Sequence, residues 1–292
     1  MKMERKGWIN LLFILPALLL FTAIIYYPLF NSIKYSFTSW NMTSPLYEYI
    51  GFKNYADMFS DDLVKAGFKN TFVFTLYSTL IGNSLALLLA LVLDSNLRAK
   101  KFLRSVFYIP CLLSPIVISA VFGNILQYHG VLNEFFHKVG LDFLINDWFA
   151  NAASAMPMLI ILNAWQYLGY GSIIYLAGLQ TIPAELYETA RMDGASKFKT
   201  FRFVTFPLLM PSITIMTFMS ITGGLKLFDI PFVLTQGGPG TATETMGTVI
   251  FKIAFRHQKF GYATAISVVF FILIAVISVL QVRYTRKREV VL

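Results

Sequence analysis

"YETARMDGASKFKTFRFVTFPLLMP", residues 187–211, is a charged segment between two of the most apolar stretches of the chain. Of the 292 residues, 57% are hydrophobic and only 13% are charged, whereas a soluble domain carries about 25% charged residues. This composition predicts a membrane protein that crosses the bilayer several times. The quoted segment is then a loop between two membrane helices, and its many charges need an explanation.

Six stretches are long enough to cross the bilayer as helices, since about 30 Å of hydrocarbon needs roughly 20 residues. We expect spans at about 9–30, 71–93, 105–127, 155–178, 206–225 and 262–282. The first run is too long for a signal peptide and lacks a small-residue cleavage site, which favours a retained anchor. With a single cysteine, Cys111, the chain has no internal disulfide framework.

The distribution of basic residues predicts which segments face the cytoplasm. With the N-terminus inside, 15 of the 24 Lys and Arg residues fall in cytoplasmic segments, and the net charge is +9 inside and 0 outside. The positive-inside rule therefore favours cytoplasmic positions for both termini. The charge is spread over several segments as topology requires, which argues against a nucleic-acid partner. Lys252, Arg256 and Lys259 fall outside in this topology and are unexplained.

The quoted segment has the pattern of two short helices joined by a glycine. Thr181 and Pro183 are suited to the start of the first helix. Gly194 is suited to its end, because glycine readily adopts the left-handed conformation there. Ser196 is suited to capping the second helix. We call residues 181–204 the elbow and expect it to be cytoplasmic.

The elbow resembles the EAA loop in the membrane subunits of binding-protein-dependent ABC importers. The residues that match the loop are Glu188, Ala190, Asp193, Gly194, Ala195 and Pro207. A second stretch, "LTQGGPGTATET" from Leu234, resembles the outer L-T-x-G-G-P-x-x-x-T segment of sugar permeases. Together they resemble the carbohydrate type of this family, which handles sugars, oligosaccharides and glycerol phosphate.

The resemblance implies an all-α polytopic protein with six transmembrane helices and the type I ABC importer permease fold. It implies one permease domain over residues 1–292 of a bacterial cell-membrane protein, and import of a sugar or sugar derivative. The implied partners are a second homologous permease, an ATPase dimer and an external solute-binding protein. Glu188, Ala190, Asp193, Gly194 and Ala195 would couple this chain to the ATPase. No phosphate-binding loop motif occurs in the sequence, so ATP and Mg²⁺ would bind to the ATPase and this chain would not be an enzyme.

Polar residues in the fourth and fifth spans mark a candidate substrate pathway, because polar groups at mid-membrane depth are costly. Asn163, Gln166, Tyr167 and Tyr170 recur at helical spacing, and Ser220 and Gly224 lie beyond the midpoint of the next span. Amides and tyrosine rings suit a neutral polyol, although hydrogen bonding between helices is the alternative role. Asn83 is a weaker candidate, and Lys226 and Asp229 are expected to form a local ion pair.

Two other classes of transporter remain as alternatives. An ABC permease for a non-sugar solute would have the same elbow. An ion-coupled secondary transporter would need carboxylates within the membrane or an internal repeat, and the spans contain neither.

Overall fold

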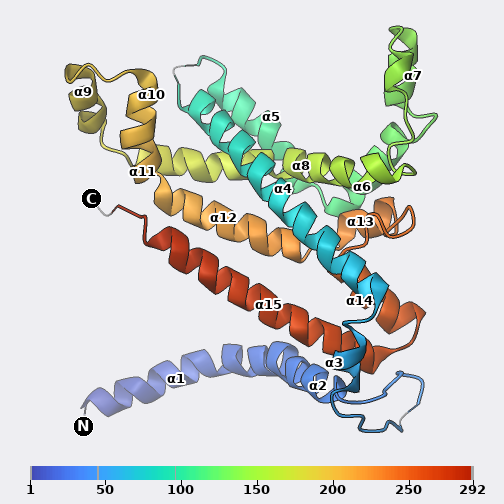
Figure 1. Cartoon of the computed structure of the whole chain (residues 1–292). Coiled ribbons are helices and arrows are strands. Elements are labelled where there is room, and N and C mark those ends of the chain that lie inside the picture. Colours follow the sequence, from blue (N-terminus) through green and yellow to red (C-terminus); the bar gives the residue numbers. More distant parts are fainter. Residues whose placement is uncertain (1, 45, 96, 291–292) are drawn as a thin grey trace. The chain divides into compact units, whose positions relative to one another are not determined.

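The computed structural model describes residues 2–44, 46–95 and 97–290, so the extreme ends of the predicted domain, residues 1 and 291–292, lie outside the described part. The described residues are mostly helical, and their one β-type pairing is an isolated bridge between Thr38 and Tyr49. The predicted all-α fold is confirmed (Figure 1).

The α-helices follow one another with few long loops. They are α1 Lys2–Phe21, α2 Tyr27–Tyr35, α3 Lys53–Asp57, α4 Asp62–Asp94, α5 Lys100–Leu112, α6 Pro115–Leu126, α7 Val131–Lys138, α8 Ala152–Gln180, α9 Ala184–Met192, α10 Lys197–Thr200, α11 Phe206–Leu208, α12 Met210–Leu225, α13 Asp229–Leu234, α14 Met246–Phe251 and α15 Phe260–Arg286. Short π-helical segments occur at Thr22–Tyr26, Phe201–Thr205 and Lys252–Arg256, and a 3-10 turn at Asp142–Leu144.

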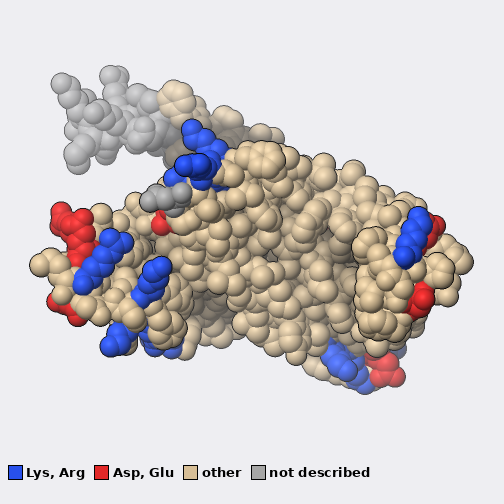
Figure 2. All heavy atoms as spheres, turned by 90° about the horizontal axis from the view of Figure 1, so that it is seen from above, with Lys and Arg blue, Asp and Glu red and all other residues tan. Residues whose placement is uncertain are grey.

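Six helical stretches in the described part are long and apolar enough to cross a membrane, as predicted. They are Leu12–Tyr35, Asp62–Asp94, Pro115–Lys138, Ala152–Gln180, Met210–Leu234 and Phe260–Arg286. The second stretch begins at Asp62 instead of residue 71, so α4 extends well beyond its apolar segment. On the face shown in Figure 2, Lys, Arg, Asp and Glu lie in separate groups, and a broad area without such side chains lies between the groups. This is the surface expected of a protein embedded in lipid.

The third predicted span, 105–127, is not one continuous helix. It consists of α5 and α6, which are separated by Leu113 and Ser114 in extended conformations. The physical reason is Pro115, because a proline disfavours the helical region for the residue before it. Pro110, by contrast, is accommodated inside α5.

The chain divides into two compact units, which we describe separately. The first runs to Asp61 and includes Ile250–Ile272. Buried Asn54 organises it, because its side-chain nitrogen donates to the carbonyls of Ser36 (2.8 Å) and Thr38 (2.9 Å). The Gly261 amide donates to the Trp40 carbonyl at 2.8 Å, which ties the start of α15 to the segment after α2. Whether the units form one permease domain stays a prediction.

The second unit comprises Asp62–Val249 and Leu273–Leu292, and its core lies where α4 packs against α8 and α12 (Figure 1). One buried cluster combines side chains of all three helices, such as Ala90, Tyr175 and Met216. Two glycines let the helices approach closely. A Cβ atom on Gly171 would meet the Ala86 side chain at 2.8 Å, and one on Gly224 would meet Thr75 Oγ1 at 2.9 Å. These contacts place the middle parts of α4 and α8 and the C-terminal part of α12 around a common space.

Candidate functional site

A cavity of about 380 Å³ lies within the second unit, between α4, α8 and α12. The start of α6 and the α12–α13 connection complete its wall. The residues that line it are Ser78, Gly82, Asn83, Ala86, Pro115, Asn163, Ala164, Tyr167, Tyr170, Met216, Met219, Ser220, Gly223, Gly224, Lys226, Leu227, Phe228, Asp229 and Ile230. Its volume lies in the range of small-molecule sites.

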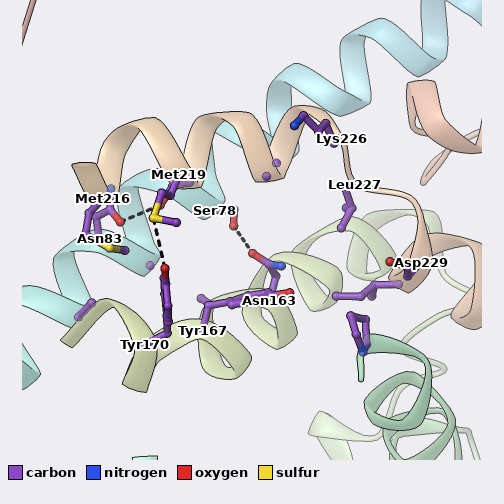
Figure 3. A pocket seen from close by; sticks show the side chains of 18 of the residues that line it. Ser78, Asn83, Asn163, Tyr167, Tyr170, Met216, Met219, Lys226, Leu227 and Asp229 are labelled. Carbon is purple, nitrogen blue, oxygen red and sulfur yellow. Dashed lines mark hydrogen bonds between the residues drawn. The ribbon is translucent and has the colours of Figure 1, made fainter. Parts of the chain in front are cut away.

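Hydrogen bonds between helices hold the polar side chains of the cavity. Ser78 Oγ donates to Asn163 Oδ1 at 2.7 Å, and these side chains point toward one another from α4 and α8 (Figure 3). Ser220 Oγ of α12 donates to Asn83 Oδ1 at 2.9 Å. Both amide oxygens are thus occupied, while neither amide nitrogen has a hydrogen-bond partner among the described residues. Two amide donors are therefore available to a ligand.

Tyrosine rings and methionines form the more apolar part of the wall. Tyr170 and Met219 meet across the α8–α12 interface, where the tyrosine hydroxyl donates to Met219 Sδ at 3.4 Å (Figure 3). Tyr167 also lines the cavity and is 43% exposed. Neutral polar groups and aromatic faces therefore line the same space.

The structure brings together five of the six residues predicted for the pathway: Asn163, Tyr167, Tyr170, Ser220 and Gly224. Gln166 is placed elsewhere. It is only 1% exposed, does not line the cavity, and donates from Nε2 to the Leu113 carbonyl at 3.2 Å. Helical spacing puts Gln166 on the same stripe as Asn163 and Tyr170, but its side chain bonds to the break between α5 and α6.

The ion pair expected between Lys226 and Asp229 is absent. Neither side chain has an ion-pair partner in the described part of the chain. Lys226 and Asp229 both line the cavity instead, at its α12–α13 side (Figure 3). The short connection after Leu225 leaves the helical spacing that the expectation assumed, because α12 ends there and α13 begins at Asp229.

Sequence reasoning underestimated the contribution of α4. Ser78 and Asn83 are hydrogen-bonded parts of the wall. The sequence pattern does not predict Ser78 as a pathway residue and indicates Asn83 only weakly. Their spacing, with Gly82 beside Asn83, was the available signal. It is weak by itself, because small polar residues also occur where membrane helices merely pack.

The elbow has the geometry that its sequence predicts. After α9, Gly194 has φ +70°. The Gly194 amide donates to the Arg191 carbonyl at 3.0 Å, and the Ala195 amide donates to the Ala190 carbonyl at 2.9 Å. This pair of bonds is the Schellman motif, which satisfies the last carbonyls of a helix. Ser196 then caps α10 by accepting from the Lys199 amide at 3.4 Å.

The start of the elbow differs from the expectation. Thr181 does not cap α9, since its hydroxyl donates to the Gly178 carbonyl at 2.8 Å and it terminates α8 instead. Pro183 occupies the cap position of α9 without a side-chain hydrogen bond, because proline has no side-chain acceptor.

One face of α9 packs against the helices, and the opposite face is exposed. Ala190 is buried, and Leu186 and Tyr187 pack against the core cluster shared by α4 and α8. Glu188 and Asp193 are exposed together with Gly194, and Met192 is 88% exposed. The elbow is therefore attached to the second unit while it presents both apolar and acidic groups outward.

The L-T-x-G-G-P-x-x-x-T segment forms a tightly bonded turn. Thr235 and Thr243, eight residues apart, join hydroxyl to hydroxyl at 2.6 Å, and Thr243 Oγ1 also donates to the Gly238 carbonyl at 2.6 Å. Glu244 is buried and accepts from Thr248 Oγ1 at 2.6 Å. The segment's threonines thus have a structural role in closing the loop.

A membrane protein whose helices surround a cavity lined by both polar and apolar side chains has the architecture of a membrane transport subunit. Residues 82–290 match the binding-protein-dependent transport system inner membrane component family. The chain belongs to this family, whose members are permease subunits of ABC importers.

Relatives of this family are similar over nearly the whole chain. The multiple sugar-binding transport system permease protein MsmF of Streptococcus mutans is 33% identical, over 99% of both chains. The lactose transport system permease protein LacF of Rhizobium radiobacter is 32% identical, over 98% of this chain and 96% of that one. A bacterial ABC transporter involved in the import of the acidic polysaccharide alginate has a chain with a TM-score of 0.85 and 24% identity, which covers 98% of both chains. The likeness to that structure confirms the type I importer permease fold.

Proposed function

We propose that this chain is the transmembrane subunit of an ATP-driven importer that moves a sugar or sugar derivative into the cytoplasm. The observation that carries the proposal is the cavity, which the side chains of Asn83, Asn163 and Tyr167 line together and in which both asparagine amide nitrogens lack a hydrogen-bond partner among the described residues. Sugar hydroxyls accept hydrogen bonds from amides, and the C–H face of a sugar ring packs on an aromatic ring. Relatives such as MsmF and LacF, whose names specify sugars, support the same substrate class.

The elbow is proposed to dock on a separate ATPase subunit. ATP-driven closure of a nucleotide-binding dimer has to move the membrane helices, and a rigid segment between α8 and α12 suits that task because both helices line the cavity. Glu188 and Asp193 would make polar contacts, Ala195 would allow close approach of the ATPase, and Gly194 would supply the bend, while Ala190 is buried and would instead let α9 pack closely on the helices of this chain. ATP and Mg²⁺ would bind to the ATPase dimer and not to this chain.

The remaining partners and the topology belong to the same proposal. A second permease would complete the pathway, and an external solute-binding protein would deliver the sugar. Both termini would be cytoplasmic, as the distribution of basic residues predicts. Reporter fusions at residues 60, 140 and 240 should report outside positions, and fusions at 99 and 195 inside positions. A cytoplasmic signal at residue 240 would contradict this topology.

Cysteine labelling of the assembled importer tests the cavity. In a Cys111→Ser background, single cysteines at 163 and 167 should react with aqueous thiol reagents in at least one nucleotide state. A cysteine at 162 is the matched control, because Leu162 is buried on the same helix and does not line the cavity. Failure of both positions to react in every nucleotide state would mean that these residues only pack helices.

A second candidate is an anionic sugar derivative, and the position of Lys226 favours it. This side chain lines the cavity without an ion-pair partner in the described part of the chain. Asp229 stands on the same wall and would oppose an anion. Uptake assays with matched neutral and acidic sugars discriminate the two candidates, since a Lys226→Met variant should lose only the uptake of acidic sugars.

A further inference from the structure

Gln166 is the one predicted pathway residue that the structure places outside the cavity, although its neighbour Tyr167 lines it. The side chain is 1% exposed and makes one hydrogen bond, from Nε2 to the carbonyl of Leu113, at 3.2 Å. Leu113 lies in the break between α5 and α6. The other polar atom of Gln166, Oε1, is buried and has no hydrogen-bond partner among the residues that the structure describes. A glutamine kept in so costly a place needs a reason beyond packing.

The Leu113 carbonyl explains what Gln166 supplies. In a continuous helix this carbonyl would accept from the amide of Val117. Here that amide donates to Ser114 Oγ at 3.3 Å, because Ser114 is extended and caps α6. The break thus takes away the helical partner of Leu113, and Gln166 of α8 replaces it. We call residues 113–115 the joint.

The joint is where the third span changes neighbours. Before it, α5 packs along α8, and the backbone of Phe107 lies so close to Gly169 that no side chain fits there. After it, α6 packs against α13 (Figure 1). Pro115, the first residue of α6, lines the cavity. Because Pro115 belongs to both the joint and the cavity wall, a change in the joint changes the cavity wall.

We infer that Gln166 is a positioning residue for transport, which holds the joint so that Pro115 completes the substrate cavity. The inference deepens the proposed function, because it assumes that the solute crosses at this cavity. Without the amide donor, the part-buried Leu113 carbonyl loses its partner from α8, and the joint spends less time in the arrangement that binds solute. The apparent affinity falls by the same factor as that population.

The test uses the assembled importer in lipid nanodiscs, with solute uptake and ATP hydrolysis measured together. Gln166→Met keeps the length of the side chain and removes the donor. We expect the KM for solute to rise at least about 5-fold with kcat within about twofold of wild type. Gln281→Met is the matched control. Gln281 Nε2, on α15, also donates to a backbone carbonyl, that of Thr214 at 3.5 Å, but Thr214 lies inside the unbroken helix α12. The KM of this control should stay within about twofold of wild type.

A double-mutant cycle separates positioning from general stability. Pro115→Ala removes the residue that keeps Ser114 extended, so α5 and α6 can join and the Val117 amide can bond to Leu113. In that background Gln166→Met should change KM by less than about twofold, because the carbonyl already has a partner. Additive effects of the two substitutions, or an unchanged KM in Gln166→Met alone, would overturn the inference. If Gln166→Met does not assemble, Ser114→Ala tests the joint, and its KM should rise about threefold through loss of the cap on Val117.

Hydrogen exchange keeps this inference separable from the proposed function. Amides of residues 112–118 should exchange at least about 5-fold faster in Gln166→Met than in wild type, with no solute present. If the wild-type importer moves no sugar, the proposed function is wrong, and exchange still decides the joint. Faster exchange supports the role of Gln166 in holding it, and unchanged exchange overturns that role.

Discussion

The ends of α7 and α9 have the same backbone geometry in two different parts of the second unit. Gly140 after α7 has φ +73°, and Gly194 after α9 has φ +70°. In both, the glycine amide bonds back to the helix, to His137 at 3.1 Å and to Arg191 at 3.0 Å. The next amide closes a second bond, from Leu141 to Phe136 at 2.8 Å and from Ala195 to Ala190 at 2.9 Å. Both helices therefore end in the same Schellman motif.

What differs is the connection of each motif to the cavity. The elbow joins α8 to α12, and both of these helices contribute side chains to the cavity wall. α7 also lies between two helices that line the cavity, α6 and α8, but the 139–151 loop separates its motif from α8, whereas the elbow continues through α10, the 201–205 segment and α11 into α12. A local motif thus has functional weight only through the elements that it connects. The predictions below test this comparison, from the largest expected effect to the smallest.

Substitution of the two glycines by proline should have unequal consequences. Proline has φ near −65° and no amide hydrogen, so each variant loses the same bond and the same left-handed conformation. We expect Gly194→Pro to reduce solute uptake at least about 100-fold, because the loss of about 3 kcal/mol distorts the surface that docks on the ATPase. Gly140→Pro, the control, should retain most of the uptake. Equal losses in uptake assays with both variants would remove the distinction between the motifs.

Charge reversal on the two short helices should separate them as well. Glu188 on α9 and Glu134 on α7 are both exposed acids. Glu188→Lys should weaken co-purification of the ATPase about 30-fold or more, as loss of one side of a polar contact does in an interface. Glu134→Lys should leave it unchanged. Wild-type ATPase binding by Glu188→Lys would show that the elbow does not dock as proposed.

Substitutions in the cavity between α4, α8 and α12 should change the apparent affinity for solute and leave assembly of the importer unchanged. Asn163→Ala removes an amide donor and frees the Ser78 hydroxyl. We expect KM for solute to rise about 10-fold, since a lost hydrogen bond that leaves a buried partner costs about 1–3 kcal/mol. Ile161→Ala on the same helix is the control, because Ile161 is 52% exposed and does not line the cavity. Uptake kinetics in which both variants behave alike would assign Asn163 to packing.

The smallest effect is expected at Lys226. This exposed cation has no ion-pair partner in the described residues, so its removal should leave neighbouring groups satisfied. For a neutral sugar, Lys226→Met should change KM by less than about twofold, because an exposed charge contributes little to binding a neutral ligand. A large increase in KM for neutral sugars would show that Lys226 contacts them directly, which would sharpen the account of the α12–α13 side of the cavity.

Much of the elbow could be predicted because its determinants are local. Gly194 and Ser196 act on backbone groups within a few residues of themselves, so the sequence alone indicates the helix end and the cap. Thr181 was assigned to the wrong helix for a related reason. Its hydroxyl is able to bond either at the end of α8 or at the start of α9, and the residue type alone does not predict which bond forms.

The cavity was predictable only in part. Helical spacing placed Asn163, Tyr167 and Tyr170 together, but spacing cannot show which neighbouring helix each side chain meets. Gln166 belongs to the same stretch and faces the joint, because α5 and α6 break beside it. The role of Ser78 depends on the side chain of Asn163, 85 residues away along the chain.

The sequence by itself determined the membrane environment, the six apolar helices and the elbow, because hydrophobicity, helix length and backbone caps act over short distances along the chain. Only the tertiary structure decided three features. Gln166 bonds to the joint, Lys226 and Asp229 line the cavity without pairing with each other, and α4 supplies part of the cavity wall. These features depend on which helix faces pack together. That choice rests on contacts such as Gly171 with Ala86 and Gly224 with Thr75, between residues that lie far apart in the chain.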